Sequence, residues 1–342
     1  MKQLPKPVTL LKIIIITCLA FPCKSREITA PVLSPVFSKE AAAEFLKRPL
    51  VLCKREVDPK KAEKLSKKDP EQLKSEETYN NYFNQAMKLY FDSLYKGSKT
   101  IELKSEQEVN ALIQASSPAV AIVLPVSMDR TLTLNGKTKY LETYSFNMML
   151  PDKNNEEFII SFMSDLLSDA DFVFLVQQIN IHLQKIIAGE TLPSYSWSNK
   201  NTAGKLKNLK LIVNMQKIKE GLTKEEITEN YKYPIEFVDS LSDYEDIVTG
   251  QKPGYAYITS VWSPTLWGAG YIVVDAGTGE ILSILSAGGV HVAIGWQPPK
   301  TGNWAQDKYN KRYAFDVIQF KVKYSLKGGH FKQFNKLAEE SN

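Results

Sequence analysis

Cysteine and histidine are scarce in this sequence, and their scarcity excludes several classes of site. The 342 residues include three cysteines (Cys18, Cys23 and Cys53) and three histidines (His182, His291 and His330). A disulfide framework, a CxxC redox pair or a cysteine-based zinc site cannot be assembled from so few thiols. The histidines lie far apart and form no HExxH pair, so we expect no metal site.

The sequence also lacks the short motifs that mark well-known enzymes. It has no GxSxG elbow, no Walker loop and no dinucleotide-binding fingerprint, so we expect no cofactor. Asp275, Ser286 and His291 can be combined on paper into a hydrolase triad, but they carry no local signature, and a turn explains Asp275. We expect Cys53 and His182 to be packing residues. We therefore predict no catalytic residue and favour a protein that is not an enzyme.

The apolar run at the amino terminus is too short to cross a bilayer. It spans residues 13–21 (IIIITCLAF), follows three lysines and has the length of a signal-peptide core. We predict a signal peptide over residues 1–20, with cleavage after Ala20 or, alternatively, after Ser25. The mature chain would be periplasmic or extracellular, with no transmembrane helix. In a lipid-anchored alternative, Cys23 carries the lipid.

The net charge gives no sign of nucleic-acid binding. The whole chain carries +5, but Lys2, Lys6 and Lys12 lie in the predicted signal peptide, which contains no acid. The remaining residues carry a net charge of +2 and are close to neutral. We therefore expect no nucleic-acid partner.

Two stretches of the sequence share one order of predicted elements. Downstream, a strand at residues 235–240 is followed by a helix, a strand at 255–262, and two strands at 271–285 around a turn at Asp275. The upstream stretch has the same order, with a strand at 100–105, a helix at 109–114, a strand at 119–126, and a pair at 144–150 and 158–164. We therefore predict an α/β protein made of two tandem, diverged copies of one α/β unit. Each unit would be a mixed sheet with a terminal β-hairpin and flanking helices.

Boundaries follow from these two units. We divide the chain into a signal peptide (1–20), a lead segment (21–48), unit 1 (49–189), a linker (190–208), unit 2 (209–330) and a tail (331–342). The copies differ between their third and fourth elements, where unit 1 has a hairpin signal at Asn135-Gly136 and unit 2 has the tryptophan-rich SPTLWGAG.

Helix starts are marked by capping residues. We predict helices that begin after Ser38, Asp58, Asp69, Ser105, Ser168, Thr223 and Ser242. Glu245 would complete a capping box with Ser242. An aromatic stripe from Tyr79 to Leu94 is typical of a helix that covers the core of unit 1, and the helix after Ser168 should end at Gly189.

One short segment resembles a known hairpin. Residues 274–282 (VDAGTGEIL) are similar to a hairpin found in exported domains, including PepSY-type modules and propeller blades. The resemblance covers this segment alone, and it implies a turn and no site.

The aromatic residues of unit 2 are the candidate binding residues. Flat aromatic rings in connections serve sugar or peptide recognition, although packing onto the sheet is the alternative explanation. The candidates are Trp262, Trp267, Trp296 and Trp304, with Tyr255 in support. We therefore predict an exported, non-enzymatic binding or interaction protein, whose partner is a protein, peptide or glycan. A bilobed small-ligand receptor and a hydrolase with an unrecognised site are the alternatives.

Overall fold

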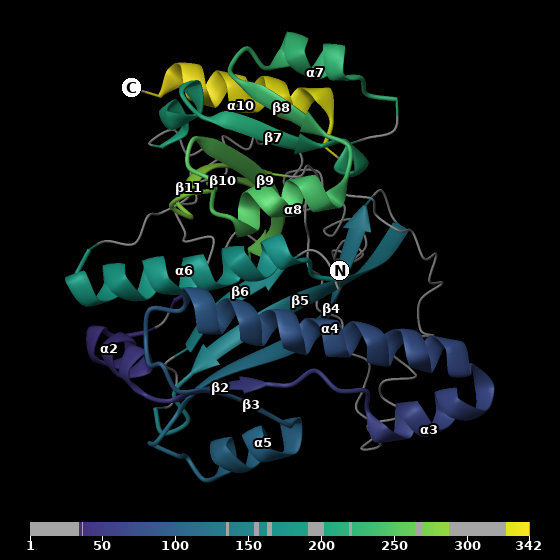
Figure 1. Ribbon diagram of the computed structural model, residues 1–342, viewed down its shortest axis with the longest axis vertical. Coiled ribbons are helices and arrows are strands. Elements are labelled where there is room, and N and C mark those ends of the chain that lie inside the picture. Colours follow the sequence, from purple (N-terminus) through teal and green to yellow (C-terminus); the bar gives the residue numbers. More distant parts are fainter. Residues whose placement is uncertain are drawn as a thin grey trace, which may run out of the picture.

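The structure is a computed structural model, and it describes most of the chain. The described residues are 34–35, 37–134, 137–153, 157–162, 166–190, 202–218, 221–263, 268–286 and 326–341. They form a mixed α/β fold with eight α-helices around one mixed sheet of eleven strands (Figure 1). The predicted α/β class is therefore confirmed. In the described part of the chain, none of the helices combines the length and the hydropathy that a bilayer crossing requires.

Unit 1 supplies one half of the sheet. Its strands lie in the order β3, β2, β4, β5, β6, with β2 parallel to both β3 and β4 and the last three strands antiparallel. Their bounds are β2 (Leu50–Cys53), β3 (Ile101–Lys104), β4 (Ala121–Leu134), β5 (Lys137–Met149) and β6 (Glu157–Phe162). The predicted hairpin turn at 135–136 lies outside the described residues, between the paired Leu134 and Lys137.

Unit 2 supplies the other half with the same order of strands and directions. Here the order is β8, β7, β9, β10, β11, with β7 parallel to β8 and β9, and β9, β10 and β11 antiparallel. The bounds are β7 (Lys210–Asn214), β8 (Ile235–Val238), β9 (Tyr255–Ser263), β10 (Gly268–Asp275) and β11 (Ile281–Ser286). The halves join where Ser161 and Phe162 of β6 pair with Trp262 and Val261 of β9, and the short β1 (Ser34–Pro35) pairs with β6.

Four helices cover one side of the joined sheet. They are α2 (Lys39–Lys47), α4 (Pro70–Leu94), α6 (Asp169–Ala188) and α8 (Leu241–Thr249). One buried cluster lies beneath them and takes side chains from both units, for example Phe146 and Phe158 from unit 1 and Tyr257 and Ile272 from unit 2. The main core is therefore continuous across the two units.

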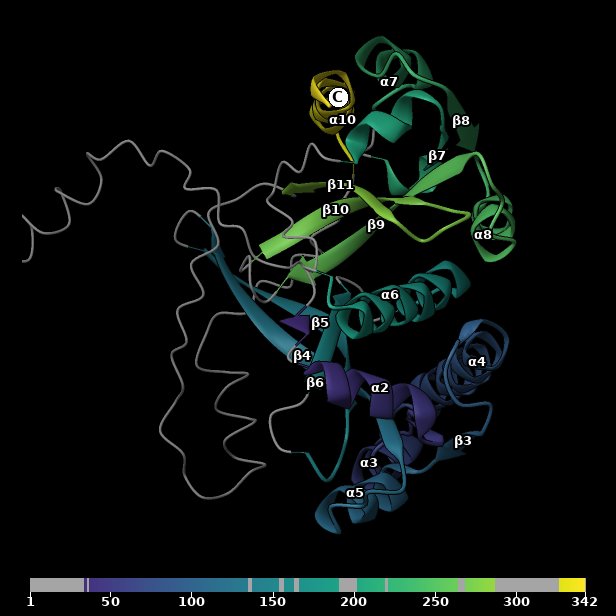
Figure 2. The same ribbon diagram turned by 90° about the vertical axis from the view of Figure 1, so that its left-hand side faces the viewer.

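The opposite side of the sheet has two separate, smaller cores. One lies under α5 (Glu106–Gln114) against β2 and β4. The other lies under α7 (Lys224–Asn230), α10 (Gly328–Glu340) and the 3-10 turn η1 (Ala203–Lys207), against the strands of unit 2. Two further elements, α3 (Pro59–Lys68) and η2 (Met215–Lys217), bury no residue. In the view of Figure 2, α4, α6 and α8 lie on one side of the strands and α10 lies at the end of the molecule.

Helix α6 lies between the two halves of the sheet (Figure 1). Towards unit 1, the ring of Phe174 packs against that of Phe162, with centroids 5.9 Å apart. Towards unit 2, Gln178 Nε2 donates a hydrogen bond of 2.6 Å to the carbonyl of Gly279, in the turn between β10 and β11. The helix ends as predicted at Gly189, which has a positive φ of 73°.

Most of the predicted helix starts are confirmed, and one is wrong. The caps at Ser38, Asp58, Asp69, Ser105, Ser168 and Thr223 all occur. The helix predicted to begin after Ser242 instead begins after Ser240, whose Oγ accepts a hydrogen bond from Asp243 N at 3.0 Å. Ser240 takes the cap because its backbone is still extended after β8. Glu245 therefore belongs to the second turn of α8 and is available for another contact.

The carboxyl-terminal helix differs from the sequence prediction. Residues 331–342 were expected to be a tail after Gly328-Gly329, but these glycines are the first residues of α10. Phe331, Phe334 and Leu337 recur at helical spacing and are buried in the core of unit 2. Their burial outweighs the low helix propensity of the two glycines. The predicted linker also contributes to this core, because Ala203 and Leu206 are buried there.

Candidate functional site

The structure separates the predicted aromatic residues. Tyr255 begins β9 and Trp262 lies seven residues along the same strand, so their backbones are about 23 Å apart. Trp262 lies at the junction of the units, where it pairs with Ser161 and Ala269. Three further candidates, Trp267, Trp296 and Trp304, lie outside the described residues. The backbones of Tyr255 and Trp262 therefore lie near opposite ends of β9.

Tyr255 takes part in a polar network on its own sheet. The ammonium of Lys210 lies 5.1 Å from the centre of the Tyr255 ring and 3.0 Å from Glu236 Oε2. The hydroxyl of Tyr255 donates to the same carboxylate oxygen at 3.3 Å. The hydrogen bond that Lys210 donates to Glu236 also raises the pKa of Lys210. These contacts tie neighbouring strands together and give Tyr255 a structural explanation.

The residues considered for catalysis have structural roles. Burial raises the pKa of Cys53 to about 12, so its thiol stays protonated at neutral pH. Burial lowers the pKa of His182 to about 4, and its Nδ1 donates to the carbonyl of Gln178 at 2.8 Å. Asp275 Oδ1 accepts hydrogen bonds from the amides of Gly277 and Thr278 at 2.9 and 3.0 Å, as expected for a turn residue.

The remaining partners of the hydrolase triad cannot be placed. His291 and the side chain of Ser286 lie outside the described residues. The part of the chain that the structure describes contains no group of three His, Cys, Asp or Glu placed to hold a metal ion.

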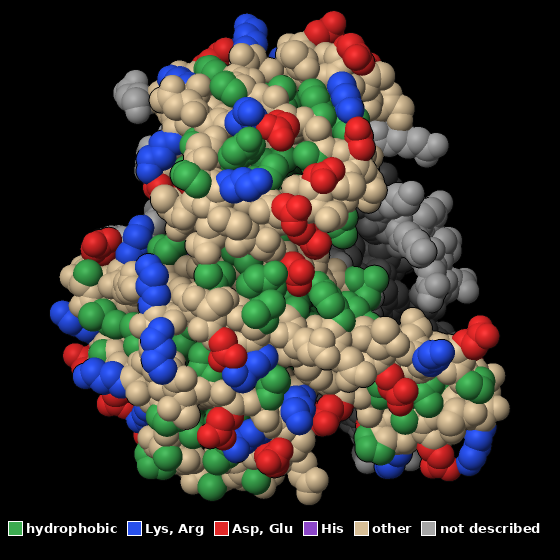
Figure 3. Space-filling model, in the orientation of Figure 1, with side chains coloured by type: hydrophobic (Ala, Val, Ile, Leu, Met, Phe, Trp, Pro, Cys, Tyr) green, Lys and Arg blue, Asp and Glu red, His purple; other side chains and the backbone are tan. Residues whose placement is uncertain are grey.

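A surface where the two units meet has the most unusual composition. We call it the seam, and define it by Tyr79 and Tyr82 of α4, Leu166 and Asp169 at the start of α6, and Leu241 and Glu245 of α8. The described residues include four large hydrophobic side chains that are exposed, and three of them are in the seam. Tyr82 is 37% exposed, Leu166 62% and Leu241 39%. Figure 3 shows hydrophobic side chains gathered on the face where α4, α6 and α8 come together.

Two tyrosines hold the chain in place at the start of α6. The hydroxyl of Tyr79 accepts a hydrogen bond of 2.6 Å from the amide of Leu167. One turn further along α4, the hydroxyl of Tyr82 donates to Asp169 Oδ1 at 2.9 Å. These bonds fix the loop that carries Leu166, and Leu166 is therefore presented to solvent by a supported backbone.

Three carboxylates surround this helix start. Asp171 Oδ2 accepts from the amide and hydroxyl of Ser168 at 2.9 and 3.0 Å, at the predicted helix start. Glu245, from α8 in unit 2, lies beside Asp169 and Ser168 at this helix start. Burial raises the pKa of Glu245, and the charges of Asp169 and Asp171 raise it further. Unit 2 thus places the carboxylate of Glu245 at the amino terminus of α6, a helix of unit 1.

A shallow hollow extends the seam along α4. It has a volume of about 600 Å³ and is lined by Glu71, Lys74, Ser75, Thr78, Tyr79 and Tyr82. All of these residues come from three turns of one helix. The hollow therefore continues directly into the exposed apolar side chains of the seam.

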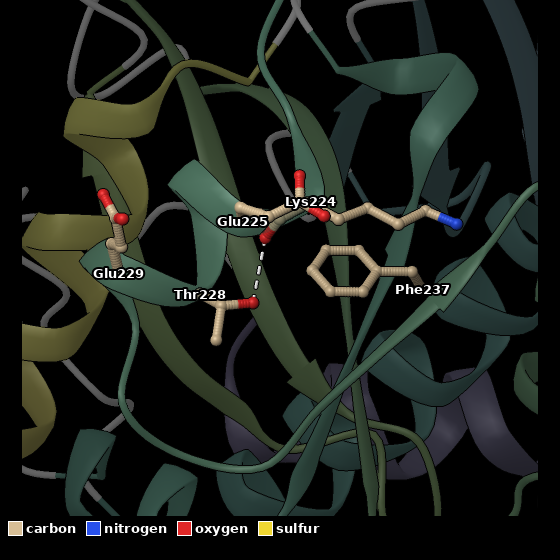
Figure 4. A pocket seen from close by; sticks show the side chains of 5 residues that line it. All are labelled: Lys224, Glu225, Thr228, Glu229 and Phe237. Carbon is tan, nitrogen blue, oxygen red and sulfur yellow. Dashed lines mark hydrogen bonds between the residues drawn. The ribbon is translucent and has the colours of Figure 1, made fainter.

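A second hollow, of about 560 Å³, lies on unit 2. Figure 4 shows its lining: Lys224, Glu225, Thr228, Glu229 and Phe237. The Lys224 ammonium is 5.8 Å from the centre of the Phe237 ring and 3.1 Å from Asp239 Oδ1. Because its cation already has these two partners, this hollow offers less to a ligand than the seam.

Sequence reasoning missed the seam. Tyr79 and Tyr82 were assigned to a core stripe, and that assignment fits Phe83, Met87 and Phe91, which are fully buried. Nothing local distinguishes Tyr82 from them, because its exposure depends on how α4 packs against α6.

The chain matches no protein-family model, no curated protein and no solved structure. The site therefore has to be interpreted from its own geometry.

Proposed function

We propose that this protein is an exported, non-enzymatic interaction protein that binds another protein through the seam. The observation that carries the proposal is that three exposed large hydrophobic side chains, Tyr82, Leu166 and Leu241, belong to elements that come together on one face, namely α4, the start of α6 and α8 (Figure 3). Single exposed apolar side chains are ordinary, but a cluster on a supported surface is typical of a recognition site. The hydrogen bonds of Tyr79 and Tyr82 support it further, because a surface that is already ordered loses little entropy on binding.

The bilobed-receptor alternative is less well supported. A receptor of that kind opens and closes about a hinge between two lobes. Here α6 packs against both units, and one buried cluster takes residues from both. Opening a cleft at this place would separate buried apolar surfaces such as those of Phe174 and Ile272.

Export is proposed from the sequence, since residues 1–20 lie outside the described part of the chain. Amino-terminal sequencing of the protein from its native source should find a start after Ala20 or Ser25. An intact Met1 would contradict export by this route, and a lipid on Cys23 would support the anchored alternative. The tryptophan-rich connections stay a proposed second site for a peptide or glycan.

We also propose that units 1 and 2 are diverged copies of one ancestor. The matching strand orders and directions support common ancestry, and so does the helix between β3 and β4 in unit 1 and between β8 and β9 in unit 2. Sequence profiles built separately from relatives of each unit should align with Ile101 on Ile235 and Ala121 on Ala256. A best alignment in any other register would contradict the duplication.

A photo-crosslinking experiment tests the proposed function. A crosslinking amino acid is placed at Leu166, at Leu241 and, as a matched control, at Leu89, which is 58% exposed on α4 outside the seam. In cells of the source organism, the two seam positions should give the same discrete adduct, and position 89 should not. The absence of adducts at both seam positions, or an equal adduct from position 89, would overturn the proposal.

The partner identified from the adduct then allows a quantitative test. With purified proteins, Leu166→Ser should weaken binding at least about tenfold, while Leu89→Ser should leave it unchanged. Both variants should keep the thermal midpoint of the parent protein, because both side chains are largely exposed.

A further inference from the structure

We infer that the partner segment recognised by the seam carries lysine or arginine beside bulky apolar side chains. This inference rests on the proposed function and names the chemistry of the partner. It follows from how charge and apolar surface alternate in the seam.

Two carboxylates of the seam, Asp169 and Glu245, and the neighbouring Asp171 have no cationic side chain of the described residues as an ion-pair partner. Within the described residues, the hydrogen-bond donors to Asp169 and Asp171 are uncharged groups: the hydroxyl of Tyr82 for Asp169, and Ser168 and the hydroxyl of Thr259 for Asp171. Among the ion pairs formed within the described residues, none involves any of the three carboxylates. The seam therefore has negative charge that a cation from outside can balance.

Each exposed apolar side chain has a carboxylate as its neighbour. Tyr82 is hydrogen-bonded to Asp169, and Leu166 lies three residues before Asp169. Leu241 lies four residues before Glu245 on α8, so both project from the same face of that helix. A binding segment must therefore offer apolar and cationic groups side by side to satisfy this surface.

The hollow along α4 indicates the size of the segment. Its lining residues run from Glu71 to Tyr82, which corresponds to about 16 Å along the helix axis. That length accommodates about three turns of a helix from the partner. The charges of Glu71 and Lys74 offset each other, so the attraction for cations is concentrated at the seam end.

Two other occupants fit less well. A symmetric dimer through the seam would bring Asp169 and Glu245 of one copy against the same carboxylates of the other, and like charges would repel. An anionic lipid surface would be repelled by the same groups. A basic, amphipathic protein segment avoids both penalties.

Paired peptides test the inference with the purified exported chain. One fluorescent peptide, about 14 residues long, has leucine and lysine in amphipathic order, and its match has glutamate at every lysine position. Fluorescence anisotropy should show the lysine peptide binding at least about tenfold more tightly, with an advantage that shrinks as salt is raised. Equal affinities, or tighter binding of the glutamate peptide, would overturn the inference.

Variants locate the binding and control for folding. Glu245→Gln keeps a hydrogen-bond acceptor and removes the charge, so it should weaken the lysine peptide several-fold and leave the glutamate peptide unchanged. Leu166→Ser should weaken binding of the lysine peptide, and Leu89→Ser should not. A lysine peptide that binds equally well to the Glu245→Gln and Leu166→Ser variants would show that it binds elsewhere, and would overturn the inference.

The other occupants give distinct results. A concentration-dependent dimer in sedimentation that is lost in Leu166→Ser would favour a second copy. Stronger binding to phosphatidylglycerol vesicles than to phosphatidylcholine vesicles would favour a membrane. Either result would overturn the inference. If the crosslinks at Leu166 and Leu241 succeed but the two peptides bind alike, the proposed function stands and only the cationic partner is excluded.

Discussion

Helices α6 and α10 are the first described helices after β6 and β11, the last described strands of the two units, but they bury their side chains differently. In α6, twelve of twenty residues are buried, and they lie all around the helix. In α10, one face is buried and the other carries exposed polar residues: Lys332, Gln333, Lys336, Glu339 and Glu340.

This difference follows from what each helix touches. A helix that packs against both halves of the sheet and against helices on either side must be apolar nearly all round, whereas a helix at the end of the molecule needs one apolar stripe and a polar outer face. Helix α6 is therefore part of both units, and α10 closes the molecule at unit 2. Substitutions in and around the two helices test this difference in burial.

The largest loss of stability is expected when one large buried side chain in each helix is truncated. We expect Phe174→Ala in α6 and Phe334→Ala in α10 each to lower the free energy of unfolding by about 4 kcal/mol, because both rings are fully buried. Chemical denaturation measures that loss. Hydrogen exchange should then show faster opening of β5 and β10 together in Phe174→Ala, but of β10 alone in Phe334→Ala. Unchanged protection of β10 in Phe174→Ala would contradict the shared role of α6.

Acid should weaken the fold mainly through the histidine of α6. Burial lowers the pKa of His182 to about 4, against 6.5 for an exposed histidine. Between these values the unfolded chain binds a proton and the folded chain does not, so stability falls as pH drops from 6.5 to 4. The loss should reach about 3 kcal/mol. Denaturant unfolding at both pH values should show that His182→Leu loses much less stability between them than the parent protein does.

The histidine of α10 is the matched comparison. Burial also lowers the pKa of His330, and the charge of Lys327 adds to the effect. Because His330 is less enclosed than His182, we expect His330→Gln to remove less of the acid sensitivity. If His330→Gln removed more of the acid sensitivity than His182→Leu, the expected order of the two substitutions would be contradicted.

Alanine substitutions at two glycines of unit 2 distinguish the cost of backbone strain from the cost of a steric clash with α6. Gly279 and Gly254 have φ values of 76° and 83°, so alanine at either position should cost about 1–2 kcal/mol. A Cβ on Gly279 would lie 2.8 Å from Cβ of Gln177 in α6, whereas a Cβ on Gly254 would have no atom within 4 Å. Gly279→Ala should therefore cost at least about 1 kcal/mol more than Gly254→Ala in urea unfolding. Equal losses of unfolding free energy in the two variants would mean that a Cβ at Gly279 does not clash with Gln177 of α6.

The smallest effect is expected where unit 2 meets the start of α6. The pKa of Glu245 is raised, so its charge costs stability at neutral pH, and that cost disappears as pH falls towards 4.5. Glu245→Gln should stabilise the protein at pH 7 by less than about 1 kcal/mol, since the side chain is half exposed and screened. The gain should vanish near pH 4.5. A stabilisation that persists there would have another cause.

Local signals explain what the sequence predicted correctly. Caps such as Ser105 and Thr223 act within four residues, and the turn at Asp275 is made by its own carboxylate, so each is visible in a short window. The order of strands and helices along each unit followed from the same short-range patterns. The cap at Ser240 was missed because Ser240 and Ser242 are both suitable residues, and the end of β8 decides between them.

Features that depend on tertiary packing were not visible in the sequence. Helix α10 was missed because two glycines suggested an end, while its apolar face became meaningful only against β11 and η1. The ion pair between Arg48 and Asp152 joins residues far apart in the sequence, so no short window shows it. The seam requires α4, α6 and α8 together, and no single segment carries its signal.

The two-sided packing of α6 also fixes when the protein can finish folding. A chain that grows or is exported from its amino terminus completes α6 long before Ile272 and Ile281, which cover its second side, are available. Until unit 2 is available, the apolar side chains on that side of α6 are exposed to solvent. The molecule therefore matures in one late, cooperative step rather than unit by unit, and a chain cut at Gly189 should aggregate instead of forming a stable half.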